Sequence, residues 1–110
     1  MLPRKFRISR KEFALVKKEG QRVSGPFFAL LLKKGEGVKV GFIISKKIDK
    51  RATVRNKIKR RLSQALLPFL PKIKPKTHIV FLAKKVLGEK NFLEIEREVK
   101  RMLTKAKLFL

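Results

Sequence analysis

The segment from Ser45 to Arg61, SKKIDKRATVRNKIKRR, carries the side chains with the clearest chemistry. Lys and Arg dominate it, and Asp49 is its only carboxylate. From Ala52 onward the pattern predicts a helix with one apolar face and one densely cationic face. Lys offers a point charge to phosphate, whereas Arg offers a planar fork that grips phosphate or stacks on a base. The segment therefore predicts a surface that binds a polyanion, and we favour RNA.

Protein side chains that could cleave a phosphodiester bond are not visible in the sequence. The chain has 1 His, and its 8 acidic residues are dispersed. Two-metal hydrolysis needs clustered carboxylates, and no Walker or dinucleotide glycine motif is present. The chain has 0 Cys, which excludes disulfides, thiolate metal sites and cysteine nucleophiles. We expect no catalytic residue and no metal site on the protein, and we expect His78 to be structural or at the surface.

Length and charge describe a small, strongly basic protein. The 110 residues predict a single domain (1–110), and 44% hydrophobic residues suffice for one modest core. The net charge of +23 opposes folding by self-repulsion, which indicates a partner rich in negative charge. Nucleic acid is the first candidate and an anionic membrane surface the second. The sequence shows no secretory signal and no membrane span, and it fits a cytosolic protein.

Hydrophobic periodicity and turn signals predict an α+β domain. A capping box of Ser9 and Glu12 begins the first helix, and Gly20 ends it. The predicted elements are a basic arm (1–8), a helix to about residue 19, a strand (26–32), a strand (38–44), a helix (52–67), a strand (78–83) and a helix (91–108), with a possible short strand at 21–24. We expect the strands at 26–32 and 38–44 to form a hairpin, and the later strand–helix–strand unit to form a parallel pair with a crossover.

The two long helices should each bury an apolar stripe. Thr53 is a candidate N-cap for the helix at 52–67, and Asn91 with Glu94 caps the last helix. The stripes are Val54, Ile58, Leu62, Ala65 and Leu66, and Phe92, Ile95, Val99, Met102, Leu103 and Ala106. The outward residues of the basic helix are predicted to be Asn56, Lys59, Arg60 and Ser63. Phe42, Phe81 and Phe92 are predicted core residues. Phe27 and Phe28 should point to opposite faces of their strand, and an exposed one could stack on an unpaired base.

The basic segment closely resembles the arginine-rich signature of the bacterial ribonuclease P protein component. The signature is Ser-Lys-Lys, then small residues, then Arg-Asn followed two residues later by Lys-Arg. It reads here as Ser45-Lys46-Lys47, Arg51-Ala52-Thr53, Arg55-Asn56 and Lys59-Arg60. Arg7-Ile8, Phe13, Gly20 and Gly41 stand in the family's order, so the resemblance covers about residues 4–108.

Three features depart from the family's pattern. Lys50 stands where a Gly is usual, Ser63-Gln64 where Arg-Glu is usual, and His78 where an acid often begins the strand. The change at 63–64 affects one expected RNA contact.

The resemblance implies a fold and a partner. The fold is a single-domain α-β-β-(β)-α-β-α sandwich of the ribosomal protein S5 domain 2-like type, with an unusual left-handed βαβ crossover. General sequence physics would give a right-handed one in about 98% of cases. The implied function is to assist a catalytic RNA that removes the 5′ leader from precursor tRNA. The RNA subunit carries the chemistry, with Mg²⁺ held mainly by the RNA subunit and the substrate.

The resemblance also implies two sets of contact residues. The surface for ribonuclease P RNA comprises Ser45, Lys46, Lys47, Lys50, Arg51, Arg55, Asn56, Lys59, Arg60 and Arg61. The cleft for the leader of precursor tRNA comprises Phe13, Val16, Phe28 and Leu31. The implied location is cytoplasmic, with no membrane partner and no small-molecule substrate.

Two other functions remain as alternatives. A structural ribosomal protein or a general RNA chaperone would share the charge, but the Arg-Asn-x-x-Lys-Arg spacing disfavours both. A membrane-surface protein would need Trp or Phe on the apolar face of the basic helix, and that face offers only aliphatic residues.

Overall fold

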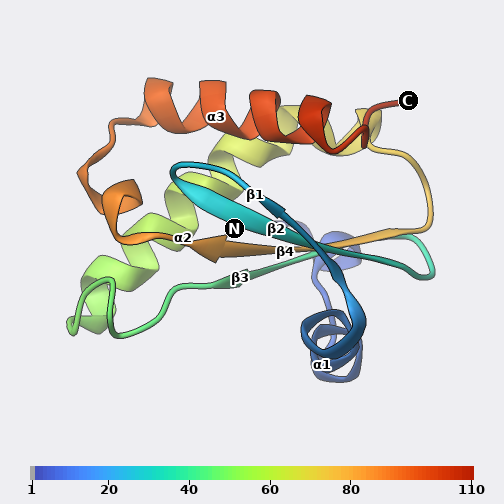
Figure 1. The fold of residues 1–110 in the computed structure, drawn as a ribbon, viewed down its shortest axis with the longest axis horizontal. Helices are drawn as coiled ribbons and strands as arrows, with labels where there is room; N and C mark the ends of the chain where they lie inside the picture. The colour runs from blue at the N-terminus through green and yellow to red at the C-terminus, as the bar shows by residue number, and fades with distance from the viewer. Residues whose placement is uncertain (1) are drawn as a thin grey trace.

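Three α-helices and a four-stranded sheet make up residues 2–110, which a computed structural model describes (Figure 1). Met1, the first residue of the predicted basic arm, lies outside the described residues. The elements are η1 (Arg4–Phe6), α1 (Arg10–Glu19), β1 (Gln21–Ser24), β2 (Phe28–Lys34), β3 (Val38–Ile43), α2 (Ala52–Leu66), η2 (Leu67–Lys72), β4 (Thr77–Ala83), η3 (Lys85–Glu89) and α3 (Phe92–Lys105). The predicted α+β class is confirmed, and the possible strand at 21–24 is β1.

The order of the strands in the sheet is β1-β2-β4-β3. β4 pairs antiparallel with β2, from Phe28 opposite Ala83, and parallel with β3, from Val38 opposite Thr77. The expected hairpin between β2 and β3 is therefore wrong, because β4 lies between them. The reason is burial: Ile79, Val80 and Phe81 are buried whichever face they point to, and a strand that is apolar on both faces favours the centre of a sheet.

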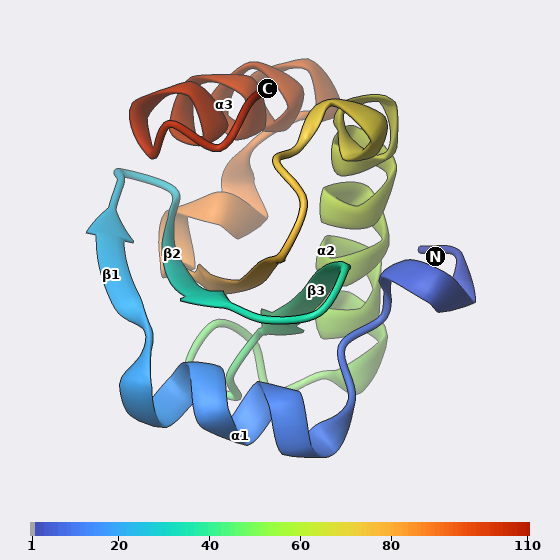
Figure 2. The same ribbon diagram turned by 90° about the vertical axis from the view of Figure 1, so that its right-hand side faces the viewer.

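The crossover that joins β3 to β4 through α2 is left-handed. In Figure 2, β3 points away from the viewer, α2 returns above the sheet, and β4 lies on the side of β3 that faces β2. This path is the mirror image of the right-handed connection that the general rule favours. The handedness implied by the family resemblance is therefore confirmed.

Helices α2 and α3 cover one face of the sheet, and α1 lies on the other face (Figure 2). The hydrophobic core fills the first of these interfaces, where Phe28, Leu30 and Phe81 of the sheet belong to one buried cluster with residues of both helices. The rings of Phe28 and Phe81 lie 5.2 Å apart. On the other face, α1 packs against β2 and β4 beneath one end of the strands and leaves their other end uncovered by a helix (Figure 1).

The predicted N-caps are present at the start of two of the three α-helices. Both predicted capping boxes are present, at Ser9 with Glu12 and at Asn91 with Glu94. Helix α2, however, begins after Arg51 and has no side-chain cap, so the assignment of Thr53 as N-cap is wrong. Phe92 is also not a core residue, because it is 40% exposed at the first position of α3.

Candidate nucleic-acid interface

The basic loop, residues 44–51, connects β3 to α2. The loop begins with a turn, in which the Ile48 amide donates a hydrogen bond to the Ser45 carbonyl oxygen at 3.0 Å. The side chain of Ile48 packs against the core, so the loop is anchored at its middle. The residues around this anchor are exposed, namely Ser45, Lys46, Lys47, Lys50 and Arg51.

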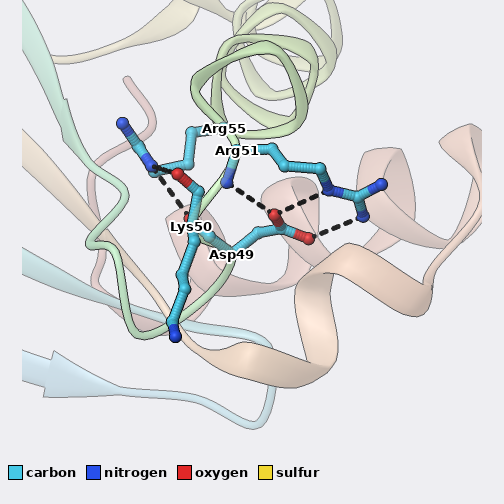
Figure 3. Close-up of polar contacts among 4 residues, drawn as sticks. All are labelled: Asp49, Lys50, Arg51 and Arg55. Carbon is cyan, nitrogen blue, oxygen red and sulfur yellow. Dashed lines mark hydrogen bonds and ion pairs between the residues drawn. The ribbon is translucent and has the colours of Figure 1, made fainter.

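Asp49 holds Arg51 within this loop (Figure 3). Its carboxylate accepts hydrogen bonds from the Arg51 backbone amide at 2.8 Å, from Nε at 3.1 Å and from Nη2 at 3.0 Å. The side-chain bonds from Arg51, followed by its backbone amide, lower the pKa of Asp49 to about 2. The same pair raises the pKa of Arg51. Both groups are therefore charged throughout the physiological pH range.

Arg55 reaches back from the first turn of α2 to the loop backbone. Its Nη1 donates to the carbonyl oxygen of Asp49 at 3.0 Å and to that of Lys50 at 2.7 Å (Figure 3). Arg55 is half-buried. Arg55, the arginine of the Arg-Asn pair, therefore fixes the loop relative to the helix, a role that the spacing of the residues did not reveal.

The outward face of α2 carries the second half of the cationic surface. Asn56, Lys59 and Arg60 are exposed, as predicted, and Arg61 is half-buried beside the apolar stripe. Ser63 is buried, and its hydroxyl donates to the Lys59 carbonyl oxygen at 2.8 Å. The prediction that Ser63 points outward is thus wrong. This side chain offers no surface to a partner.

The residues predicted for an apolar cleft separate into two groups. Phe13 and Leu31 are half-buried on the α1 side of the sheet. Val16 is fully buried, and Phe28 is fully buried in the core on the opposite face. Placing Phe28 and Val16 in an open cleft is therefore a wrong prediction, because neither side chain is accessible. β2 is apolar on both faces, so the pattern of the strand alone did not show which face holds the core.

A cavity of about 240 Å³ adjoins Phe13 and links the α1 side to the basic helix. Arg7 and Lys59 lie at its boundary, and Phe42 and Gly41 of β3 contribute its apolar wall. On α1, the ammonium group of Lys17 lies 5.9 Å from the centre of the Phe13 ring. Lys17 and Arg7 were not among the predicted contact residues, because isolated cations in a very basic chain give no distinguishing signal.

Comparison with known proteins decides the family. The family model described as Ribonuclease P matches residues 2–107. The chain belongs to the ribonuclease P protein family. Among curated proteins, the ribonuclease P protein component of Picosynechococcus sp. (strain PCC 7002) is 34% identical over 111 residues, covering 98% of this chain and 96% of that protein. That of Syntrophomonas wolfei is 33% identical over 112 residues, covering 99% and 93%.

Solved ribonuclease P proteins share the fold. The Staphylococcus aureus protein superposes with a TM-score of 0.84 at 25% identity, covering 96% of this chain and 98% of that one. The Thermotoga maritima protein gives a TM-score of 0.79 at 25% identity, covering 90% and 96%. The fold is therefore shared with these ribonuclease P proteins, and the segment that resembles the family's arginine-rich signature forms the basic loop and α2.

His78, one of the departures from the family's pattern, is buried and has structural contacts. Its Nε2 lies 2.9 Å from the carbonyl oxygen of Glu36 and 3.7 Å from the carboxylate of Glu12. It therefore ties β4 to the β2–β3 turn and to the first turn of α1. Among residues 2–110, no group of three or more His, Cys, Asp or Glu side chains could hold a metal ion. In the same residues, no helix is both long and apolar enough to cross a bilayer.

Proposed function

We propose that this ribonuclease P protein binds the RNA subunit through the basic loop and the outward face of α2, and binds the 5′ leader of precursor tRNA beside α1. In this way it assists the endonucleolytic removal of the leader. The observation that carries the proposal is the exposed set of Lys and Arg side chains around a single carboxylate, Asp49, which is itself engaged by Arg51.

Such a face gains binding free energy chiefly by neutralising phosphates. Each phosphate contact releases condensed counterions, so the affinity falls as the salt concentration rises. Lys59 and Arg60 are exposed on one face of a rigid helix, which lowers the cost of ordering them on the RNA. The same charges repel one another in the free protein.

The proposal assigns binding and positioning to the protein and the chemistry to the RNA. The acidic side chains with visible roles are occupied: Glu12 and Glu94 cap helices, Asp49 holds Arg51, and Glu98 holds Arg101. They do not fit a Mg²⁺ site, so we propose that Mg²⁺ is held by the RNA subunit and the substrate. We also place the complex in the cytoplasm.

Reconstitution tests the proposal. The protein is added to a bacterial ribonuclease P RNA at low Mg²⁺ concentration, and cleavage of precursor tRNA is followed. We expect faster cleavage with the protein present, and no cleavage by the protein alone. Cleavage without RNA that survives stringent purification would overturn the division of labour, and an RNA that gains nothing from the protein would overturn the proposal itself.

The leader would lie on the uncovered part of the sheet beside α1. Phe13 and Leu31 are half-buried there and offer apolar surface to unstacked bases, each base contact contributing about 1–3 kcal/mol. Lys17, whose ammonium lies near the Phe13 ring, would meet the phosphates of the same strand. This arrangement combines stacking with charge, as proteins that bind single strands commonly do.

Phe13→Ala tests the leader site. We expect weaker binding of precursor tRNA with a leader of several nucleotides and unchanged binding of mature tRNA, measured on the complex with the RNA subunit. Val16→Ala is the control on the same helix, because Val16 is fully buried and should change stability instead. Equal losses for both tRNAs would show that Phe13 does not contact the leader.

A further inference from the structure

Asp49 presents a conflict within the surface that we propose binds RNA. It is the only acid between Ser45 and Arg61. A negative charge among phosphate-binding cations repels the ligand, and removing it would raise the local positive potential. Simple electrostatics therefore predicts that Asp49 weakens the binding of RNA.

The contacts of Asp49 point the other way. The side chain of Arg51 is 74% exposed, whereas that of Asp49 is 24% exposed. The carboxylate engages the Nε and Nη2 atoms of Arg51. In this bidentate geometry one edge of the guanidinium is used, and the Nη1 atom lies on the edge that the carboxylate does not occupy. Arg51 is thus held in one orientation while it keeps hydrogen-bond donors for a phosphate.

The backbone under this pair is fixed as well. Asp49 accepts the amide of Arg51, two residues further along the chain, in the manner of an Asx turn. Arg55 holds the carbonyl oxygens of Asp49 and Lys50 from the other side (Figure 3). The loop and the start of α2 therefore form one unit, in which Asp49 is bound both through its carboxylate and through its carbonyl oxygen.

We infer that Asp49 is a positioning residue for RNA binding: by holding Arg51 and the end of the basic loop, it raises the affinity for RNA despite its charge. The inference rests on the proposed binding of the RNA subunit. A free arginine side chain loses considerable rotamer freedom when it binds, and the pair with Asp49 removes that loss in advance. The guanidinium of Arg51 neutralises the charge of the Asp49 carboxylate, and this reduces the repulsion between Asp49 and the phosphates.

The test compares Asp49→Asn with Glu89→Gln. Both remove one negative charge, and the amide oxygen of Asn still accepts the Arg51 backbone amide. Glu89 is exposed and lies in η3, outside the basic segment. Affinity for ribonuclease P RNA is measured at several salt concentrations. We expect Asp49→Asn to weaken binding several-fold and to reduce the salt slope by about one unit, and Glu89→Gln to leave binding unchanged or slightly stronger. Stronger binding by Asp49→Asn, or equal effects of the two variants, would overturn the inference.

A double-mutant cycle isolates the pair. In an Arg51→Ala background only the repulsion of Asp49 remains, so Asp49→Asn should then strengthen binding. A loss of affinity in that background as large as in the wild-type background would show that Asp49 acts through the general structure of the loop, which also overturns the inference.

A further variant distinguishes a failure of the inference about Asp49 from a failure of the proposed RNA-binding function. If Lys59→Ala with Arg60→Ala leaves RNA binding intact, the proposed RNA face itself fails. If that double variant binds weakly while Asp49→Asn binds well, the RNA face stands and only the role of Asp49 is lost.

Discussion

Helices α2 and α3 pack side by side on the same face of the sheet, yet they are built by opposite rules. Helix α3 begins with the Asn91–Glu94 capping box and carries ion pairs such as Arg101 with Glu98 at 2.7 Å. Helix α2 has no side-chain cap and no acid in its first turn. Both helices bury an apolar stripe in the shared core. The difference therefore lies in their ends and their outward faces.

The start of α2 holds two cations, and the carboxylate that pairs with Arg51, that of Asp49, belongs to the preceding loop rather than to the helix. Arg51 and Arg55 lie at the positive end of the helix dipole, where an acid would stabilise the helix by about 0.3–1 kcal/mol. In α3 that position is occupied by Glu94. Natural proteins break local rules of this kind mainly at functional sites. The comparison teaches that the number of Lys and Arg residues, five in α2 and four in α3, does not separate the two helices, whereas the presence and placement of acids does.

The largest expected effect concerns the core that supports both helices. Phe28→Ala should lower the free energy of unfolding by about 3–5 kcal/mol, because a fully buried ring is removed and leaves a cavity. Phe92→Ala is the matched control, because Phe92 is 40% exposed at the start of α3 and lies outside the buried core. Urea unfolding of both variants is the measurement. Similar losses would mean that the core does not extend beneath both helices as described.

The next effect separates the outward faces. Lys59→Ala with Arg60→Ala removes two exposed cations from α2, and Arg97→Ala with Lys100→Ala removes the same two residue types from exposed positions of α3. We expect the α2 variant to reduce the salt slope of RNA binding by about 1.5–2 units. The loss of affinity between 50 and 200 mM salt should then be roughly tenfold smaller than in the wild type. The α3 variant should change it little. Equal slopes for the two variants would refute the contrast between the faces.

The smallest effect separates the helix ends, with two Asn→Ala changes. Asn91→Ala should destabilise the protein by about 1 kcal/mol through loss of the cap, and should leave RNA affinity unchanged. Asn56→Ala, at an exposed position of α2, should leave stability unchanged and weaken RNA binding. Both variants are measured by thermal unfolding and by RNA titration. If the comparison holds, Asn91→Ala loses only stability and Asn56→Ala loses only RNA affinity; if both variants lose the same property, the comparison is wrong.

Sequence reasoning succeeded where a feature depends on neighbours in the chain. The capping boxes at Ser9 and Asn91 were predictable because each needs residues only three positions apart. The apolar stripe and the exposed cations of α2 followed from helical periodicity. The family resemblance supplied the left-handed crossover, which periodicity could not have given.

Predictions from the sequence failed for features that depend on contacts between residues far apart in the chain. The turn between β2 and β3 looks like a hairpin turn, but the later strand β4 enters between them. Phe28 was assigned to the wrong face because β2 is apolar on both sides. Arg55 was expected to contact RNA alone, and its bonds to the loop carbonyls depend on a loop conformation that spacing does not specify.

The central place of β4 also governs how the chain must fold. β2 and β3 are formed from residues 28–43, but the strand that joins them, Thr77–Ala83, comes more than thirty residues later. During synthesis, the edges of β2 and β3 that pair with β4 therefore stay unpaired until most of the chain has been made. Such non-local pairing slows folding and exposes edges that invite aggregation. The net charge of +23 makes chains whose sheet is still incomplete repel one another, so the excess of cations also opposes aggregation before β4 has paired with its neighbours.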